Sequence, residues 1–106
     1  MRLMSGLRKK YIAYKYKRDD LNIIEAIPID RFNAIIQKCI SEGWEIRPEY
    51  YEIERLEQAW AGKLRKGHST LHCSWSSETY GAINGPRPII QSLGNEHDLQ
   101  SSSLPS

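Results

Sequence analysis

The clearest pattern in the chain lies between Asp30 and Glu42, where apolar residues return every three or four positions. Residues at this spacing share one face of a helix. Asp30 offers an N-cap oxygen and Gly43 a residue that commonly ends a helix. The pattern predicts a helix of about three turns with one buried face. Its apolar members are Phe32, Ile35, Ile36, Cys39 and Ile40.

Other stretches alternate between apolar and polar positions or form short apolar runs, which is typical of strands. Residues 10–17 are rich in tyrosine and alternate toward their end. Residues 21–29 form an apolar run whose Pro28 indicates an edge position or the end of a strand, and residues 44–48 alternate after the predicted helix. Residues 68–75 alternate with Leu71, Cys73 and Trp75 expected to point inward, and a further strand is expected at 79–83.

Between these strands, residues 50–65 return to helical spacing. The apolar residues at this spacing are Ile53, Leu56, Trp60 and Leu64. Acidic residues near the start and basic residues near the end suit the helix dipole, so we expect a second helix. An extended segment at 49–54, continuing the preceding strand, is the alternative.

Composition changes near the C-terminus, where Gly, Pro, Asn and Ser become frequent and apolar residues sparse. A segment with little apolar surface cannot offset the entropy of ordering itself. Residues 94–106 are therefore expected to be disordered, with 83–93 as an extension of uncertain structure. The predicted organisation is a basic arm at 1–9, one domain at 10–82 and a largely disordered tail at 83–106. The fold class expected is α+β, a small two-layer domain with an antiparallel sheet of three to five strands packed on one or two helices.

A short motif at the end of the predicted helix, Glu42-Gly43-Trp44-Glu45, follows a basic strand rich in tyrosine. Over residues 10–50 this arrangement resembles the core of small uncharacterised bacterial and phage domains. The resemblance implies an α+β domain in which the glycine ends the helix and the tryptophan begins a core strand. It brings no catalytic residues, and it leaves half of the chain uncovered.

Charge is distributed unevenly along the 106 residues, although the net charge is only +2. Residues 1–18 hold seven bases and no acid, whereas residues 19–57 hold ten acids and four bases. This separation predicts a dipolar surface unless the two segments neutralise each other. No apolar run is long enough for a membrane span or a secretory signal, so a cytoplasmic protein without membrane contact is expected.

Four residues could bind zinc: Cys39, His68, His72 and Cys73. On a strand, His68 and His72 would lie about 13 Å apart, and Cys73 would face away from His72. No Cys-x-x-Cys or His-Glu-x-x-His motif is present, so a zinc-stabilised domain is a minor alternative and no cofactor is expected. Nucleophile elbows and glycine-rich phosphate loops are also missing from the sequence, which argues against an enzyme.

The size, the dipolar charge and the lack of catalytic motifs favour a small non-catalytic accessory or inhibitor that binds another protein. The phage resemblance suggests a modulator of a host machine that processes nucleic acid. Its docking face would be formed by acids, namely Glu49, Glu52, Glu54 and Glu57. The alternative is a module that binds single-stranded RNA or DNA through basic and tyrosine side chains, and a homo-oligomer is a further alternative. The side chains of this second site would be Arg8, Lys9, Lys10, Tyr11, Lys15 and Lys17.

Overall fold

The computed structural model describes residues 2–106, with side chains from residue 8 onward. Met1 lies outside the described part, so the arm predicted at 1–9 is described only in part. The elements are α1 (Arg2–Arg18), β1 (Leu21–Ile27), α2 (Ile29–Ser41), β2 (Glu45–Arg47), β3 (Trp60–Lys66), β4 (Ser69–Ser76), β5 (Tyr80–Pro86) and α3 (Arg87–His97). The predicted α+β class is confirmed. No helix within residues 2–106 is long and apolar enough to cross a membrane.

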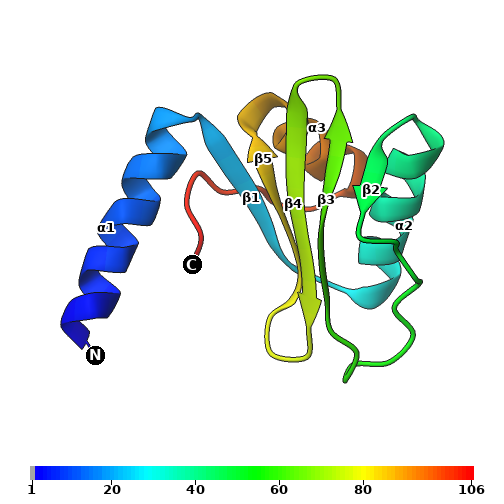
Figure 1. Cartoon of the computed structure of the whole chain (residues 1–106), viewed down its shortest axis with the longest axis horizontal. Coiled ribbons are helices and arrows are strands. Elements are labelled where there is room, and N and C mark those ends of the chain that lie inside the picture. The colour runs from blue at the N-terminus through cyan, green and yellow to red at the C-terminus, as the bar shows by residue number, and fades with distance from the viewer. Residues whose placement is uncertain (1) are drawn as a thin grey trace.

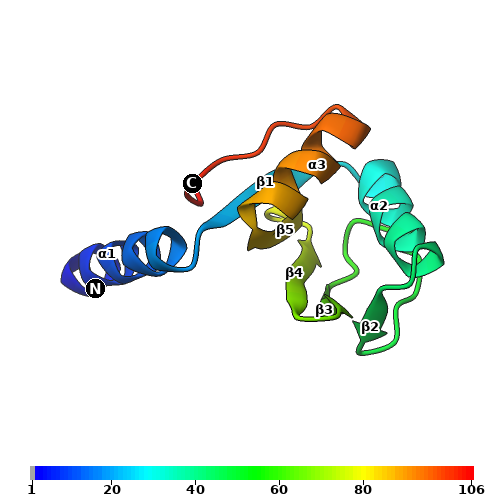
Figure 2. The same ribbon diagram turned by 90° about the horizontal axis from the view of Figure 1, so that it is seen from above.

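The five strands form one sheet in the order β1-β5-β4-β3-β2, and all neighbours are antiparallel. Helices α2 and α3 lie together on one side of this sheet, whereas α1 extends away beyond the β1 edge (Figures 1 and 2). The helix α2 connects the two edge strands, since it follows β1 and precedes β2. One face of the sheet therefore packs against helices, and the opposite face carries none.

The core lies between the sheet and α2 and is built around two aromatic rings. Phe32 of α2 is fully buried, and its ring centroid lies 5.8 Å from that of Trp75 on β4. Gly81 allows the Phe32 ring to lie close to β5, because a Cβ atom at this position would be 2.5 Å from the ring. The predicted helix at 30–42 and the inward-facing Leu71, Cys73 and Trp75 are confirmed.

The strand predicted at 10–17 is wrong, because these residues continue the helix α1. Ile12 and Tyr16 lie four positions apart, so the residues that alternate in a strand also fall on one side of a helix. Basic residues in the last turn suit the helix dipole. Tyr16 is buried, whereas Tyr11 and Tyr14 are exposed, so α1 packs through a narrow stripe only.

The helix predicted at 50–65 is also wrong. Residues 48–59 form a loop without regular structure, and β3 begins at Trp60. The alternative of a strand at 49–54 is not observed either. Ile53 is buried, as expected of a core residue, but a side chain from α2 holds it in place. The Asn33 amide nitrogen donates to the Ile53 carbonyl at 2.7 Å, and its oxygen accepts from the Ile53 N–H at 2.9 Å.

The prediction of a largely disordered tail at 83–106 is wrong, because residues 83–97 belong to β5 and α3. Residues up to Pro86 belong to β5, and Arg87–His97 form α3, which buries Ile90 and Leu93. These two residues are three positions apart, so the few apolar groups of this region fall on one helical face. Beyond α3, the segment 98–106 returns toward α1, and Ser102 exchanges two backbone hydrogen bonds with Ile23 of β1, at 2.9 and 2.8 Å.

Candidate functional site

The helix-free face of the sheet, called the open face below, is polar because side chains alternate along each strand. In β4, Leu71 and Cys73 are buried, and His72 between them is exposed. In β3, Leu64 is buried, whereas Lys63 and Arg65 are exposed. Across the four strands from β2 to β5, the residues on the open face include Glu45, Arg47, Ala61, Lys63, Arg65, Thr70, His72, Ser74, Ala82 and Asn84.

Strand register aligns four of these residues in one row across the sheet. Arg47 pairs with Lys63, Lys63 with His72, and His72 with Asn84. Adjacent strands lie about 4.8 Å apart, so the row spans roughly 14 Å. Two cations, an imidazole and a carboxamide thus lie in one row across the open face, although they are far apart in the sequence.

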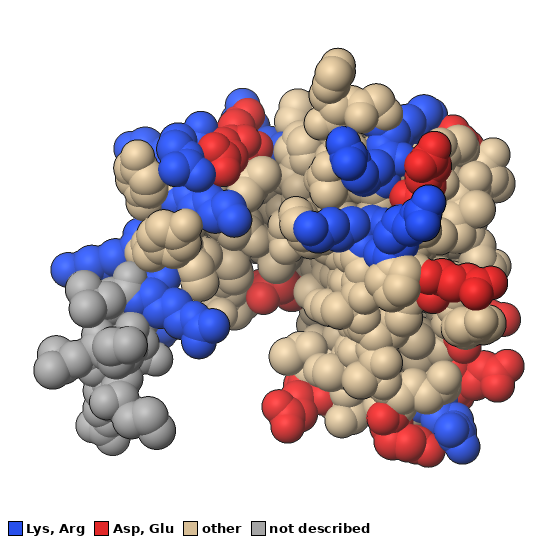
Figure 3. Space-filling model, in the orientation of Figure 1, with Lys and Arg blue, Asp and Glu red and all other residues tan. Residues whose placement is uncertain are grey.

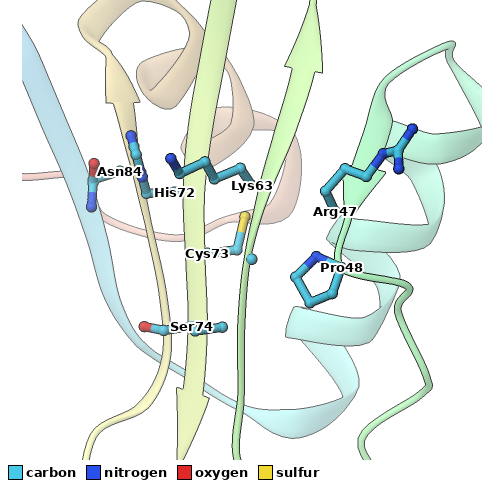
Figure 4. Close-up of a pocket in the computed structure, with 9 residues that line it drawn as sticks. Arg47, Pro48, Lys63, His72, Cys73, Ser74 and Asn84 are labelled. Atoms are coloured by element: carbon cyan, nitrogen blue, oxygen red, sulfur yellow. The ribbon is translucent and has the colours of Figure 1, made fainter.

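A shallow hollow of about 540 Å³ lies over this row, and its lining includes all four residues. Figure 4 shows Lys63 reaching across β4 toward His72, with Asn84 on the adjoining strand β5. Arg47 borders the hollow but points away from Lys63. The groups available to a ligand in the hollow are therefore an ammonium, an imidazole and a carboxamide.

The helix α1 borders a second hollow of about 440 Å³ beside the first. Tyr11 and Lys15 line it from α1, and His72 and Asn84 line it from the sheet. Because Tyr11 and Lys15 are four positions apart in the sequence, they lie on the same side of α1. His72 and Asn84 line both hollows, so the two hollows adjoin and form a groove between α1 and the open face.

The charge distribution over this groove is basic. Figure 3 shows Lys and Arg side chains in a band across the sheet and along α1. Asp and Glu are most frequent at the lower end of the sheet, and a few also lie beside the basic band and between α1 and the sheet. The ion pairs found among the described residues do not include Lys15, Lys63 or Arg65. Glu45 is the cross-strand neighbour of Arg65, and Asp19 at the end of the groove pairs with Arg18 at 2.9 Å.

Positive charge acts on the imidazole at the centre of the groove. Partial burial lowers the pKa of His72, and the nearby charges of Lys63 and Lys15 lower it further. Lys63 of β3 lines the first hollow with His72, and Lys15 of α1 lines the second hollow with it, so both lysines border His72. An anion bound beside His72 would be attracted by the positive charges of Lys15 and Lys63.

The six residues predicted to bind nucleic acid do not all line the same hollow. Tyr11 and Lys15 line the groove. Lys9 and Lys10 line a different hollow, formed with Leu104, Pro105 and Ser106, and Lys17 lies beside Ser103 and Leu104. Arg8 is exposed and lines none of the hollows described here.

The four predicted acids lie on the loop 48–59 rather than on a helix, and all of them are exposed: Glu49, Glu52, Glu54 and Glu57. Asn33 holds this loop at Ile53, and the Gln58 side chain accepts from the N–H groups of Glu54 and Arg55, at 2.8 and 2.7 Å. Tyr51 and Leu56 are exposed beside the acids. The structure thus presents the acids on an ordered loop with two exposed apolar side chains.

The four residues considered for zinc are spread over the core, the open face and the turn between β3 and β4, where His68 lies. Cys39 and Cys73 are free thiols in the core, whereas His72 belongs to the open face. Within residues 2–106, no group of three His, Cys, Asp or Glu side chains could hold a metal ion. Burial raises the pKa of Cys39 to about 11 and raises that of Cys73 as well. Both thiols are therefore neutral near pH 7 and poor nucleophiles.

No family model, curated protein or solved structure matches the chain. The resemblance to bacterial and phage domains stays a prediction, and the candidate site is assessed from its own geometry. The sequence did not indicate that Lys63, Arg65 and Asn84 share a surface with His72. Alternation along residues 68–75 placed His72 on the polar side, but the register that aligns it with its neighbours connects distant strands.

Proposed function

We propose that this protein is a small non-catalytic module that binds single-stranded nucleic acid in the groove between α1 and the open face. The observation that carries the proposal is the convergence of Lys15 and Lys63 on His72, at the point where two hollows adjoin. Ammonium groups contact phosphates without regard to sequence. The helix and the sheet together provide a path along which a phosphate backbone can lie.

The rings beside this path favour a single strand over a duplex. Tyr11 is 62% exposed and lines the groove, and His72 is exposed at its centre. Unpaired bases stack on such rings, whereas a duplex keeps its bases stacked on one another. Of the basic and tyrosine residues predicted near the N-terminus, the proposal retains Tyr11 and Lys15, which border the groove from a helix.

The test is a titration of the full chain against fluorescently labelled oligothymidylate of about twelve nucleotides, followed by anisotropy. We expect binding to weaken as salt increases. The logarithm of the association constant, plotted against the logarithm of the salt concentration, should have a slope of roughly −2 if three cations contact phosphates. The same sequence in a duplex should bind less tightly. Binding that is absent, independent of salt, or equal for the duplex contradicts the proposal.

A pair of matched charge reversals localises the site. Lys63→Glu removes a cation from the centre of the groove, whereas Arg55→Glu makes the same change of net charge on the loop 48–59. We expect Lys63→Glu to weaken binding about tenfold and Arg55→Glu to change it less than twofold. Equal effects would mean that net charge, rather than the groove, governs binding.

A second candidate function is docking on another protein through the loop 48–59. The observation that favours it is the combination of an ordered loop, four exposed acids and the exposed apolar side chains Tyr51 and Leu56. A protein partner with a basic groove would meet both the charge and the apolar contacts. If the groove binds nucleic acid and the loop 48–59 binds a protein, the protein is an accessory of a machine that processes nucleic acid.

A pull-down from cell lysate, divided into nuclease-treated and untreated halves, separates the two candidates. A partner retained in stoichiometric amount after nuclease supports docking. Its capture should be lost when Glu52, Glu54 and Glu57 are all changed to lysine while the circular dichroism spectrum stays unchanged. Partners that vanish after nuclease treatment support the groove instead.

A further inference from the structure

We propose that Lys63, His72 and Asn84 form a phosphate subsite whose occupation is coupled to protonation of the His72 imidazole. This inference rests on the nucleic-acid function proposed above and specifies where one phosphate of the strand binds. It also makes the affinity of the groove depend on pH.

The geometry of the row supports the subsite. Lys63, His72 and Asn84 are consecutive cross-strand neighbours on β3, β4 and β5, and all three line the central hollow. An ammonium and an imidazolium both donate hydrogen bonds, and so does the carboxamide nitrogen of Asn84. A phosphate over His72 would meet donors from three adjacent strands, which fix it more firmly than one flexible lysine could.

The coupling follows from the charges around the imidazole. Besides Lys63 on β3, the charged or titratable side chains that line the groove with His72 are Arg47 of β2, which points away from Lys63, Cys73 of β4, and Tyr11, Lys15, Tyr16 and Asp19 of α1. Asp19 is paired with Arg18, so the charges that act on His72 are those of the two lysines. They lower its pKa, and the empty subsite therefore holds a largely neutral imidazole near pH 7.

A bound phosphate has the opposite effect on the protonation of His72. Its negative charge favours the imidazolium over the neutral ring, so the pKa of His72 rises on binding. The complex consequently takes up a proton whenever the pH lies between the lowered value of the free protein and the raised value of the complex. By linkage, affinity increases as pH falls through this range, by at most about tenfold per pH unit for one proton.

The experiment measures binding of the same oligothymidylate from about pH 7.5 to pH 5.5 at constant ionic strength. The wild-type affinity should increase as pH falls. His72→Gln should remove this dependence, and His72→Lys should give an affinity that is high at both ends of the range. His68→Gln is the matched control, because His68 lies at the turn between β3 and β4 and should keep the wild-type dependence.

Nuclear magnetic resonance titration of the His72 imidazole identifies the ligand. Its pKa should rise in the oligothymidylate complex. A rise with inorganic phosphate alone shows that the subsite accepts the free ion, whereas a rise only with the oligonucleotide assigns it to the strand, and either result supports the subsite. Oligonucleotide binding that is independent of pH, or equally dependent in His72→Gln, overturns this inference and leaves the proposed function standing. No binding at any pH overturns the proposed function itself.

Discussion

The two faces of the sheet use the same strands for different purposes. Leu71 and His72 are adjacent in β4, yet Leu71 is fully buried against the helical layer and His72 is exposed in the groove. Lys63 and Leu64 divide in the same way on β3. Under the proposed function, alternate residues of one strand therefore serve stability and binding. Substitutions on the core face should change the free energy of unfolding, and those on the open face should change affinity alone.

The largest effect is expected from Phe32→Ala on the core side. This change removes the ring that packs against Trp75 and leaves a cavity, so we expect a loss of about 3 to 5 kcal/mol in the free energy of unfolding. Urea denaturation followed by circular dichroism measures it. Tyr14→Ala is the control, because Tyr14 is exposed on α1 and should change stability by less than about 0.5 kcal/mol. Similar losses in both variants would contradict the assigned core.

A smaller loss is expected from Asn33→Leu, which keeps the size of a buried side chain but removes its hydrogen bonds. The backbone N–H and carbonyl of Ile53 lose their partners, as does the hydroxyl of Tyr50. We expect a loss of about 2 kcal/mol and faster hydrogen exchange in the loop 48–59. Gln37→Leu changes an exposed position of the same helix and should have little effect on either measurement.

Two lysines of α1 provide a matched test of the proposed binding groove. Lys15 lines the groove, whereas Lys17 lies on another side of the helix, beside Ser103 and Leu104. Lys15→Glu should weaken oligothymidylate binding about tenfold, and Lys17→Glu less than threefold. Melting temperatures show whether either variant is unfolded. Equal losses of affinity would mean that α1 acts through its total charge and does not form one wall of a groove.

The smallest effect is expected from Tyr11→Ala. Loss of one stacking ring costs about 1 kcal/mol at the low end of measured values, which is roughly fivefold in affinity. Tyr14→Ala should leave affinity unchanged, because Tyr14 lies outside the lining of the groove, with the Arg18 guanidinium 5.4 Å from its ring centroid. Anisotropy measures both variants, and an equal loss in the two would remove Tyr11 from the site.

Elements that depend on local patterns were predicted well. The helix at 30–42 has one strongly apolar face, and β4 alternates without interruption, so neighbours along the chain determine both. The strand predicted at 10–17 was wrong because Tyr and Lys occur in strands and helices alike. The few apolar residues of this segment fit both the alternation of a strand and the spacing of a helix. The helix predicted at 50–65 failed because Asn33, twenty positions from Ile53, fixes the loop from another element.

The candidate site was predicted only in part for the same reason. Tyr11 and Lys15 were expected to act together, and the structure brings both of them to the groove. Lys63 was assigned to a helix, and His72 was considered only as a metal ligand. Their alignment with Asn84 comes from the pairing of β3, β4 and β5. Register across a sheet depends on long-range contacts, which no short stretch of sequence contains.

Both outer edges of the sheet offer little free backbone. β2 has only three residues and is followed by Pro48, which lacks an N–H donor, and at the other edge Ser102 already occupies the backbone groups of Ile23. An unprotected edge strand invites pairing with another molecule and leads to aggregation. If the protein binds nucleic acid as proposed, copies crowded along one strand would therefore meet through side chains, without merging their sheets into a growing assembly.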